Sequence, residues 1–211
     1  MARRTKQEAA ATRDHILDTA ELVFEERGVS GATLHDIAQA AGLTRGAIYW
    51  HFKGKADLFS AMMDRVRLPL EQSLQRRDGA APAEPLRRIR DSLVVSLRTV
   101  ANDAQARRVF GIAMQKVEYA GERDALRARH VAARNACLAD LERDLRLARR
   151  RGQIGPRMTT RAAAIGVHAL VDGLIQNWML APGGFDLVKV GLQALDAYLA
   201  GLAALAPGRV T

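Results

Sequence analysis

Four side chains that can hydrogen-bond or stack lie within one short stretch of the sequence: Arg45, Tyr49, Trp50 and His51. Arginine can make paired hydrogen bonds to guanine, and hydroxyl and N–H groups suit phosphate oxygens. Two aromatic side chains beside an Arg and a His are a poor choice for a helix face that meets only water. The combination therefore indicates a surface that contacts DNA. The alternative is an ordinary helical hairpin in which the two aromatic rings pack beneath a neighbouring helix.

The elements that must position these side chains are two short helices joined by a tight turn, predicted over residues 33–52. Thr33, followed three residues later by Asp36, forms a capping-box pattern at the start of the first helix. Gly42 stands where a left-handed residue ends that helix, and Thr44 precedes the second as its N-cap. The second helix then leaves one set of residues pointing outward: Thr44, Arg45, Gly46, Ala47, Tyr49, Trp50 and His51.

The first third of the chain closely resembles the TetR family of transcriptional repressors. Within that family it is most similar to the AcrR/TtgR type of drug-responsive repressors of multidrug efflux pumps. The run LTRGAIYWHFKGKADLF, residues 43–59, is the most specific part of the resemblance. Over the rest of the chain the resemblance is weaker, although it is still visible in RRGQI and VDGLIQNW.

The resemblance implies two sets of DNA contacts. Thr33, Tyr49, His51 and Lys55 would contact phosphates, and Arg45, Gly46, Ala47 and Trp50 would lie nearest the bases. The chemistry agrees, because hydroxyls and an ammonium suit phosphate oxygens and a small alanine permits close approach to a thymine methyl. The expected DNA-binding residues are Thr33, Thr44, Arg45, Gly46, Ala47, Tyr49, Trp50, His51, Lys53 and Lys55.

The composition predicts an all-α fold. Of the 211 residues 48% are hydrophobic and only 5% are aromatic, and no alternating strand pattern of useful length is present. We expect about nine helices in two domains. Residues 1–55 would form a three-helix helix-turn-helix DNA-binding domain with a basic N-terminal arm. Residues 56–211 would form a helical domain for ligand binding and dimerisation.

The net charge of +9 invites a nucleic-acid interpretation, but its distribution weakens it. Up to Lys55 there are eight Lys or Arg against seven Asp or Glu, whereas the rest of the chain carries a net +8. Most of the excess charge lies outside the predicted DNA-reading unit, and a solvated surface is favoured over non-specific DNA binding. The charge alone does not make the case for DNA.

The sequence favours a cytoplasmic protein with no membrane partner. Cys137 is the only cysteine, so no intrachain disulfide can form, which fits an intracellular setting. The first residues, MARRTKQE, lack the apolar region of a signal peptide. The most apolar stretch, residues 162–181, is interrupted by polar residues and is not predicted to span a membrane.

Residues 1–11 resemble a flexible basic arm that either reaches a DNA groove or has no ordered role. Thr12 is predicted to cap the first helix, and Gly28 to end it.

The last two helices, predicted over 160–180 and 186–204, point to a homodimer. The first is apolar nearly all round and must be buried on two sides. The second carries a seam suited to a partner helix, formed by Val188, Leu192, Leu195, Leu199 and Leu202. A two-fold four-helix interface would cover both helices, and the family resemblance implies the same arrangement.

A polar line along the first of these helices is the candidate ligand site. His168, Asp172 and Gln176 recur every four residues, and they either hydrogen-bond to neighbouring helices or across the dimer, or line a cavity. The resemblance implies a large apolar pocket that would accept apolar or cationic drug-like inducers. The expected ligand-binding residues are Val66, Arg67, Leu70, Leu93, Ser96, Phe110, Met114, Cys137, Leu141, His168, Val171, Asp172 and Gln176.

The leading hypothesis is therefore a ligand-released dimeric repressor that binds a pseudo-palindromic operator of double-stranded DNA, controlling a multidrug efflux operon. A helical adaptor for a protein partner and a same-fold regulator of a metabolic operon are the alternatives. An enzyme is not expected, because the five His and the single Cys show no metal-ligand spacing and no nucleophile motif. Neither a metal nor another cofactor is expected.

Overall fold

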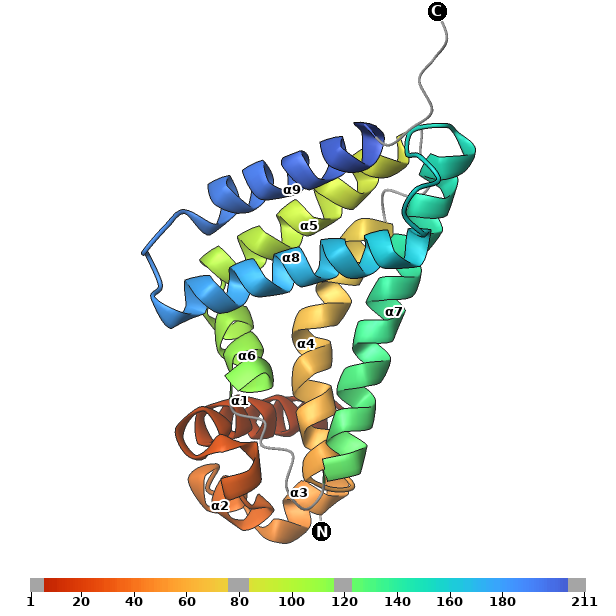
Figure 1. Ribbon diagram of the computed structural model, residues 1–211. Helices are drawn as coiled ribbons and strands as arrows, with labels where there is room; N and C mark the ends of the chain where they lie inside the picture. The colour runs from red at the N-terminus through yellow and green to blue at the C-terminus, as the bar shows by residue number, and fades with distance from the viewer. Residues whose placement is uncertain (1–5, 76–83, 116–122, 205–211) are drawn as a thin grey trace, which may run out of the picture. The chain divides into compact units, whose positions relative to one another are not determined.

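The computed structural model describes residues 6–75, 84–115 and 123–204, and these residues form helices with no strand (Figure 1). The predicted all-α fold is thus confirmed. The described elements are α1 (Lys6–Gly31), α2 (Leu34–Ala40), α3 (Arg45–His51), α4 (Lys55–Gln75), α5 (Pro85–Asn102), α6 (Ala104–Gln115), α7 (Arg123–Arg150), α8 (Thr160–Leu180) and α9 (Leu187–Ala204).

The chain folds into two compact units. The first consists of residues 1–69 and 105–130, and the second of residues 70–104 and 131–211. The chain therefore passes between the units within α4, at the start of α6 and within α7. The two units divide the chain differently from the two expected domains, because α6 and the first part of α7 belong to the same unit as the N-terminal helices.

Helix α1 contributes one apolar face to the core of the first unit. Ile16, Ala20 and Phe24 are fully buried, since they recur at the four-residue spacing of one helix face. The Phe24 ring meets Phe59 of α4 edge-on, with ring centroids 6.4 Å apart. Helix α2 packs against α1 and against α3.

The predicted start of the first helix is wrong. Thr12 lies inside α1, where its hydroxyl donates to the carbonyl of Glu8 at 2.8 Å instead of capping a first turn. Residues 6–11 are therefore helical and not part of an arm, while residues 1–5 lie outside the described residues. The predicted end is confirmed at Gly28, whose φ of 73° interrupts the helix, and the bounds of α1 extend to Gly31 because a further short turn follows this kink.

The predicted helix-turn-helix boundaries are confirmed. The Thr33 hydroxyl accepts from the Asp36 N–H at 3.1 Å, and the Asp36 carboxylate accepts from the Thr33 N–H at 2.8 Å. Gly42 follows α2 with a φ of 65°. The Thr44 hydroxyl then accepts from the Ala47 N–H at 3.2 Å and caps α3.

In the second unit α5, α8 and α9 lie side by side (Figure 1). Two glycines permit the close approach. A Cβ at Gly166 of α8 would lie 2.0 Å from the Tyr198 hydroxyl, and a Cβ at Gly191 of α9 would lie 2.5 Å from Leu97 Cδ1 of α5. Arg90 of α5 also binds the carboxylate of Asp196 on α9, with Nη2 2.9 Å from Oδ2.

Three of the five seam residues predicted on α9 are covered by helices of the same chain and not by a partner helix. Leu195, Leu199 and Leu202 are buried within the protomer, where α9 packs against α5 and α8. Heptad-like spacing shows which face of a helix is apolar and does not show whether the helix that covers it belongs to the same chain. The other two seam residues, Val188 and Leu192, are half-buried, and a partner for α9 stays a prediction.

Candidate nucleic-acid interface

The short helix α3 has one buried face and one exposed aromatic face. Ile48 is fully buried, whereas the side chains of Trp50 and Tyr49 are 71% and 51% exposed. Thr44, Arg45 and Gly46 are also exposed, and Ala47 and His51 are half-buried. The structure thus places all seven residues that were expected to point outward on one helix. The two aromatic rings are not packed beneath a neighbouring helix, which removes the basis of the hairpin alternative.

Aromatic and cationic contacts fix the end of α3. The ring of His51 meets that of Trp50 edge-on, with centroids 4.5 Å apart. The next residue, Phe52, is 2% exposed, and the Arg13 guanidinium of α1 lies 5.1 Å from the centroid of its ring. The last turn of α3 is therefore held against α1 while Trp50 stays outside.

The turn between α2 and α3 is held by a residue that sequence reasoning missed. Nε2 of His15, on α1, lies 3.0 Å from the carbonyl oxygen of Ala41, so an Nε2–H would donate to it. A histidine 26 residues from its acceptor gives no local sequence signal. This contact fixes the position of the turn relative to α1.

The hydroxyl of Thr33 already makes two hydrogen bonds within the capping box. It donates to Asp36 Oδ2 at 2.6 Å and accepts from the Asp36 N–H. The hydrogen bond from the Thr33 hydroxyl is the main reason that the pKa of Asp36 lies below its ordinary value. Arg27 also contacts the Asp36 carboxylate at 3.0 Å. A phosphate contact by Thr33 stays a prediction, and it would share a hydroxyl that already serves the cap.

The two expected lysines have different surroundings. Lys53 is exposed. The ammonium of Lys55 donates to the carbonyl oxygens of Ala32 at 3.0 Å and Ser30 at 3.3 Å. These two hydrogen bonds cap the end of α1. Lys55 thus has a structural task in addition to the phosphate contact expected of it.

On α8 the polar line expected at a ligand site lies beside the buried face. Val171 is buried, whereas the side chains of His168 and Asp172 are 21% and 44% exposed and their Nδ1 and Oδ2 atoms lie 3.5 Å apart. Gln176 is exposed. His168 and Asp172 are thus partners on the same helix, an arrangement that was not predicted, and the role of the polar line stays a prediction.

The remaining expected ligand residues fall in both units and differ in exposure. Val66, Leu93 and Leu141 are buried, Ser96, Phe110 and Met114 are half-buried, and Cys137 is exposed. The side chains of Arg67 and Leu70 lie outside the described ones. Val66, Phe110 and Met114 belong to the first unit and the other described members to the second. The set stays a prediction.

Helices α1, α2 and α3, with a capped turn between the last two and an outward aromatic face on α3, define a DNA-binding protein of the helix-turn-helix class. Residues 16–62 match the family described as bacterial regulatory proteins, tetR family. Residues 84–204 match the C-terminal region of MAATS-type transcriptional repressors.

Characterised relatives match nearly the whole chain. The regulator AcrR of Shigella flexneri is 38% identical over 192 residues, which cover 90% of this chain and 88% of AcrR. The repressor BepR of Brucella suis is 38% identical over 202 residues, or 96% of this chain and 97% of BepR. The chain belongs to the TetR family of bacterial transcriptional regulators.

Solved structures of efflux-pump repressors are also similar to this chain. NalD, the secondary repressor of the MexAB-OprM multidrug efflux pump in Pseudomonas aeruginosa, superposes with a TM-score of 0.84 at 35% identity, covering 94% of this chain and 98% of NalD. SmeT in complex with triclosan gives a TM-score of 0.81 at 35% identity, covering 95% of this chain and 97% of SmeT. A related structure describes SmeT as the repressor of the SmeDEF efflux pump of Stenotrophomonas maltophilia.

Proposed function

We propose that this chain is a homodimeric repressor that binds a pseudo-palindromic operator, controls a multidrug efflux operon and is released by apolar or cationic drug-like ligands. The observation that carries the proposal is the outward face of α3, where Trp50 is 71% exposed and Tyr49 51% exposed on a helix whose Ile48 is fully buried. The named roles of AcrR, BepR, NalD and SmeT support it. A cytoplasmic location and the absence of enzymatic activity follow from the same proposal.

In the proposed complex the α3 helices of two copies enter successive major grooves, about 34 Å apart along the duplex. Arg45, Ala47 and Trp50 would lie nearest the bases, and Tyr49 and His51 would contact phosphates. A ligand that binds better to a conformation with a different spacing would shift the population away from the DNA-competent state.

The exposed faces of α8 and α9 support the dimer. Ile165 and Leu180 of α8 are 43% and 77% exposed. By length and composition α9 is apolar enough to cross a membrane, yet only 28% of it is buried within the protomer. Packing against α5 and α8 explains its buried residues, and a partner's helices would cover apolar surface that remains. We expect Ile165→Glu to convert a dimer to a monomer in light scattering, and a wild-type monomer would contradict this interface.

The ligand part of the proposal has its own test. Asp172, half-exposed beside His168, is the carboxylate expected to favour cationic ligands. We expect Asp172→Ala to keep operator binding but to change the concentration of ethidium that releases the DNA. Identical release in the variant and the wild type would contradict a ligand role for Asp172.

The experiment that tests the function is fluorescence anisotropy with duplexes from the DNA upstream of the protein's own gene. We expect tight binding to one segment, weaker binding to a shuffled duplex, and affinity that falls steeply with added salt as counterions are released. Equal affinity for both duplexes, or binding indifferent to salt, would contradict the proposal and would favour a protein partner for α3.

A further inference from the structure

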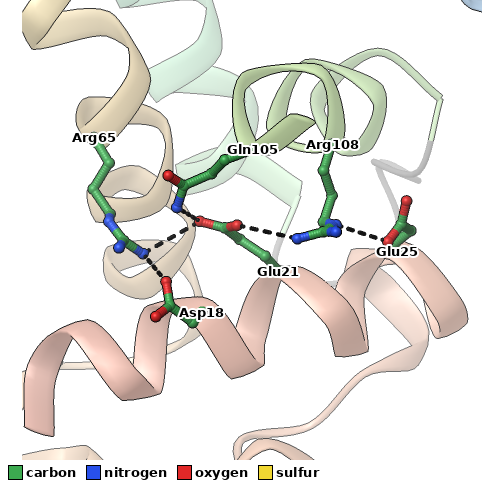
Figure 2. A network of polar contacts seen from close by, with 6 residues as sticks. All are labelled: Asp18, Glu21, Glu25, Arg65, Gln105 and Arg108. Atoms are coloured by element: carbon green, nitrogen blue, oxygen red, sulfur yellow. Dashed lines mark hydrogen bonds and ion pairs between the residues drawn. The ribbon is translucent and has the colours of Figure 1, made fainter. Parts of the chain in front are cut away.

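A buried carboxylate of α1, Glu21, is the centre of a polar cluster within the first unit (Figure 2). The residue is 1% exposed. Its Oε1 atom accepts from Gln105 Nε2 of α6 at 2.9 Å and from Arg65 Nη1 of α4 at 3.3 Å. Arg108 Nη1 of α6 lies 3.8 Å from the other oxygen, Oε2. One side chain therefore joins three helices.

Two further carboxylates of α1 extend the cluster to the surface. Arg65 Nη1 also donates to Asp18 Oδ1 at 2.7 Å, and Arg108 Nε donates to Glu25 Oε2 at 2.9 Å. The side chains of Asp18 and Glu25 are 57% and 53% exposed. Each arginine thus bridges the buried carboxylate and an exposed one, which fixes both guanidinium groups along α1 (Figure 2).

The partners of Glu21 lie where the chain passes between the two units. Arg65 precedes by one helical turn the point at which α4 leaves the first unit, after Pro69. Gln105 is the first residue of the first unit after the chain returns from α5, and Arg108 follows in the next turn. A shift of α6 away from α1 would lengthen the 2.9 Å hydrogen bond from Gln105, and a shift of α4 away from α1 would break the longer one from Arg65, because hydrogen bonds weaken steeply beyond about 3.2 Å.

Helix α1 in turn holds the DNA-reading helices. His15 binds the carbonyl of Ala41 in the turn before α3, and Arg13 lies over the ring of Phe52 directly after α3. Glu21 lies less than two helical turns from His15 on the same helix. Helix α1 therefore contacts α4 and α6 through Glu21, and contacts the turn before α3 and the residue directly after α3 through His15 and Arg13.

Stability alone does not account for a charge at this position. Burial, the largest cause, raises the pKa of Glu21 above its ordinary value in spite of the hydrogen bond from Gln105 and the charge of Arg65. Desolvating such a carboxylate opposes folding, and buried ion pairs often stabilise a protein no better than apolar groups of the same volume. What the cluster does supply is a single defined arrangement of three helices.

We infer that Glu21 is a positioning residue of the regulatory response, which couples the docking of α4 and α6 on α1 to the affinity of α3 for DNA. The inference rests on the proposed function, since it requires an operator. Coupling is reciprocal, so operator binding must stabilise the docked α6 by the same factor by which docking improves DNA affinity.

The test is amide hydrogen exchange of full-length protein, with and without a duplex from the upstream DNA of its own gene. In the wild type, the duplex should slow exchange in α6. In Glu21→Gln, which keeps the shape and removes the charge, that DNA-linked slowing should fall at least about fivefold, the lower end of typical coupling. The melting temperature should stay the same or rise. Glu26→Gln, on the same helix but with a side chain 74% exposed, is the matched control and should match the wild type.

The outcomes separate the inference from the proposed function. Undiminished DNA-linked slowing in Glu21→Gln would overturn the inference and leave the repressor proposal intact. A wild-type protein that binds no upstream duplex would overturn the proposed function itself. If Glu21→Gln does not fold, Gln105→Ala removes only a neutral donor and should reduce the slowing in the same direction; an unchanged response in Gln105→Ala would then overturn the inference.

Discussion

The outward face of α3 and the Glu21 cluster lie in the same compact unit and use polar and aromatic groups in opposite ways. On α3, Trp50 is 71% exposed, although burying an aromatic ring is strongly favourable. On α1, Glu21 is 1% exposed, although burying a carboxylate is costly. The operator proposed above would account for the exposure of Trp50, whereas partners within the chain account for the burial of Glu21. Substitutions on α3 should therefore change binding alone, and substitutions in the cluster should change how binding is regulated.

The largest effect is expected at the exposed face. Trp50→Ala should weaken operator binding by about 1–3 kcal/mol, or roughly 5- to 150-fold, because one base-proximal contact is lost. Tyr49→Ala should weaken it less, as expected for a phosphate contact. Melting temperatures should change little, since both rings are mostly exposed. Anisotropy and thermal melting measure the two quantities, with the 53% exposed Leu22→Ala on α1 as control. Wild-type affinity in Trp50→Ala would remove α3 from the interface.

Lys55 tests whether one residue can both contact DNA and stabilise the fold. Lys55→Met should lower the free energy of unfolding by about 1.5–3 kcal/mol, because two carbonyls at the end of α1 lose a charged donor. It should also weaken operator binding. Lys53→Met, at an exposed position, should affect binding only. Chemical denaturation of both variants distinguishes them, and equal stabilities would mean that the Lys55 contacts contribute nothing.

Two glycines of α8, in the second unit, allow a comparison of packing that involves no buried charge. Gly166→Ala should cost about 1–3 kcal/mol of stability, because the new Cβ would lie 2.0 Å from the Tyr198 hydroxyl and 2.8 Å from its ring carbon Cζ. Gly173→Ala, on the same helix with nothing within 4 Å of the new Cβ, should be neutral or stabilising. Urea denaturation gives both values. A harmless Gly166→Ala would show that the Tyr198 side chain can move away from α8 without cost.

The smallest effect is a pH dependence of stability. The pKa of Glu21 is raised by burial, so in the interval between its ordinary and its raised value the folded protein binds more protons than the unfolded chain. The contribution of Glu21 to the free energy of unfolding must therefore fall as the pH rises through that interval. Glu21→Gln lacks this dependence, and its stability relative to the wild type should increase from acidic to neutral pH. The opposite trend in denaturant melts would contradict a raised pKa.

Local chemistry made the helix-turn-helix predictable. Thr33, Asp36, Gly42 and Thr44 each act through neighbours no more than four residues away, so the sequence alone places the ends of α2 and α3. Thr12 shows the limit of this reasoning. A threonine hydroxyl can also bond back to the carbonyl four residues earlier, and Thr12 does so inside α1.

Long-range contacts were not predictable in the same way. His15 and Glu21 act through partners 26 and 84 residues away, in Ala41 and Gln105. A signal for Glu21 existed, because it stands on the apolar face of α1 between Leu17 and Phe24, but periodicity cannot say which helix supplies the partner. For the same reason, the leucines of α9 were expected to face a second protomer, although helices of the same chain cover three of them.

The most direct test of the central claim is the fluorescence of Trp50. The chain has two tryptophans, so Trp178→Phe leaves Trp50 of α3 as the single reporter. On titration with the upstream duplex, its emission should change saturably, and the midpoint should move to higher DNA concentration as salt is added. Binding seen by anisotropy without any change in Trp50 emission would place the DNA elsewhere on the protein and contradict the account.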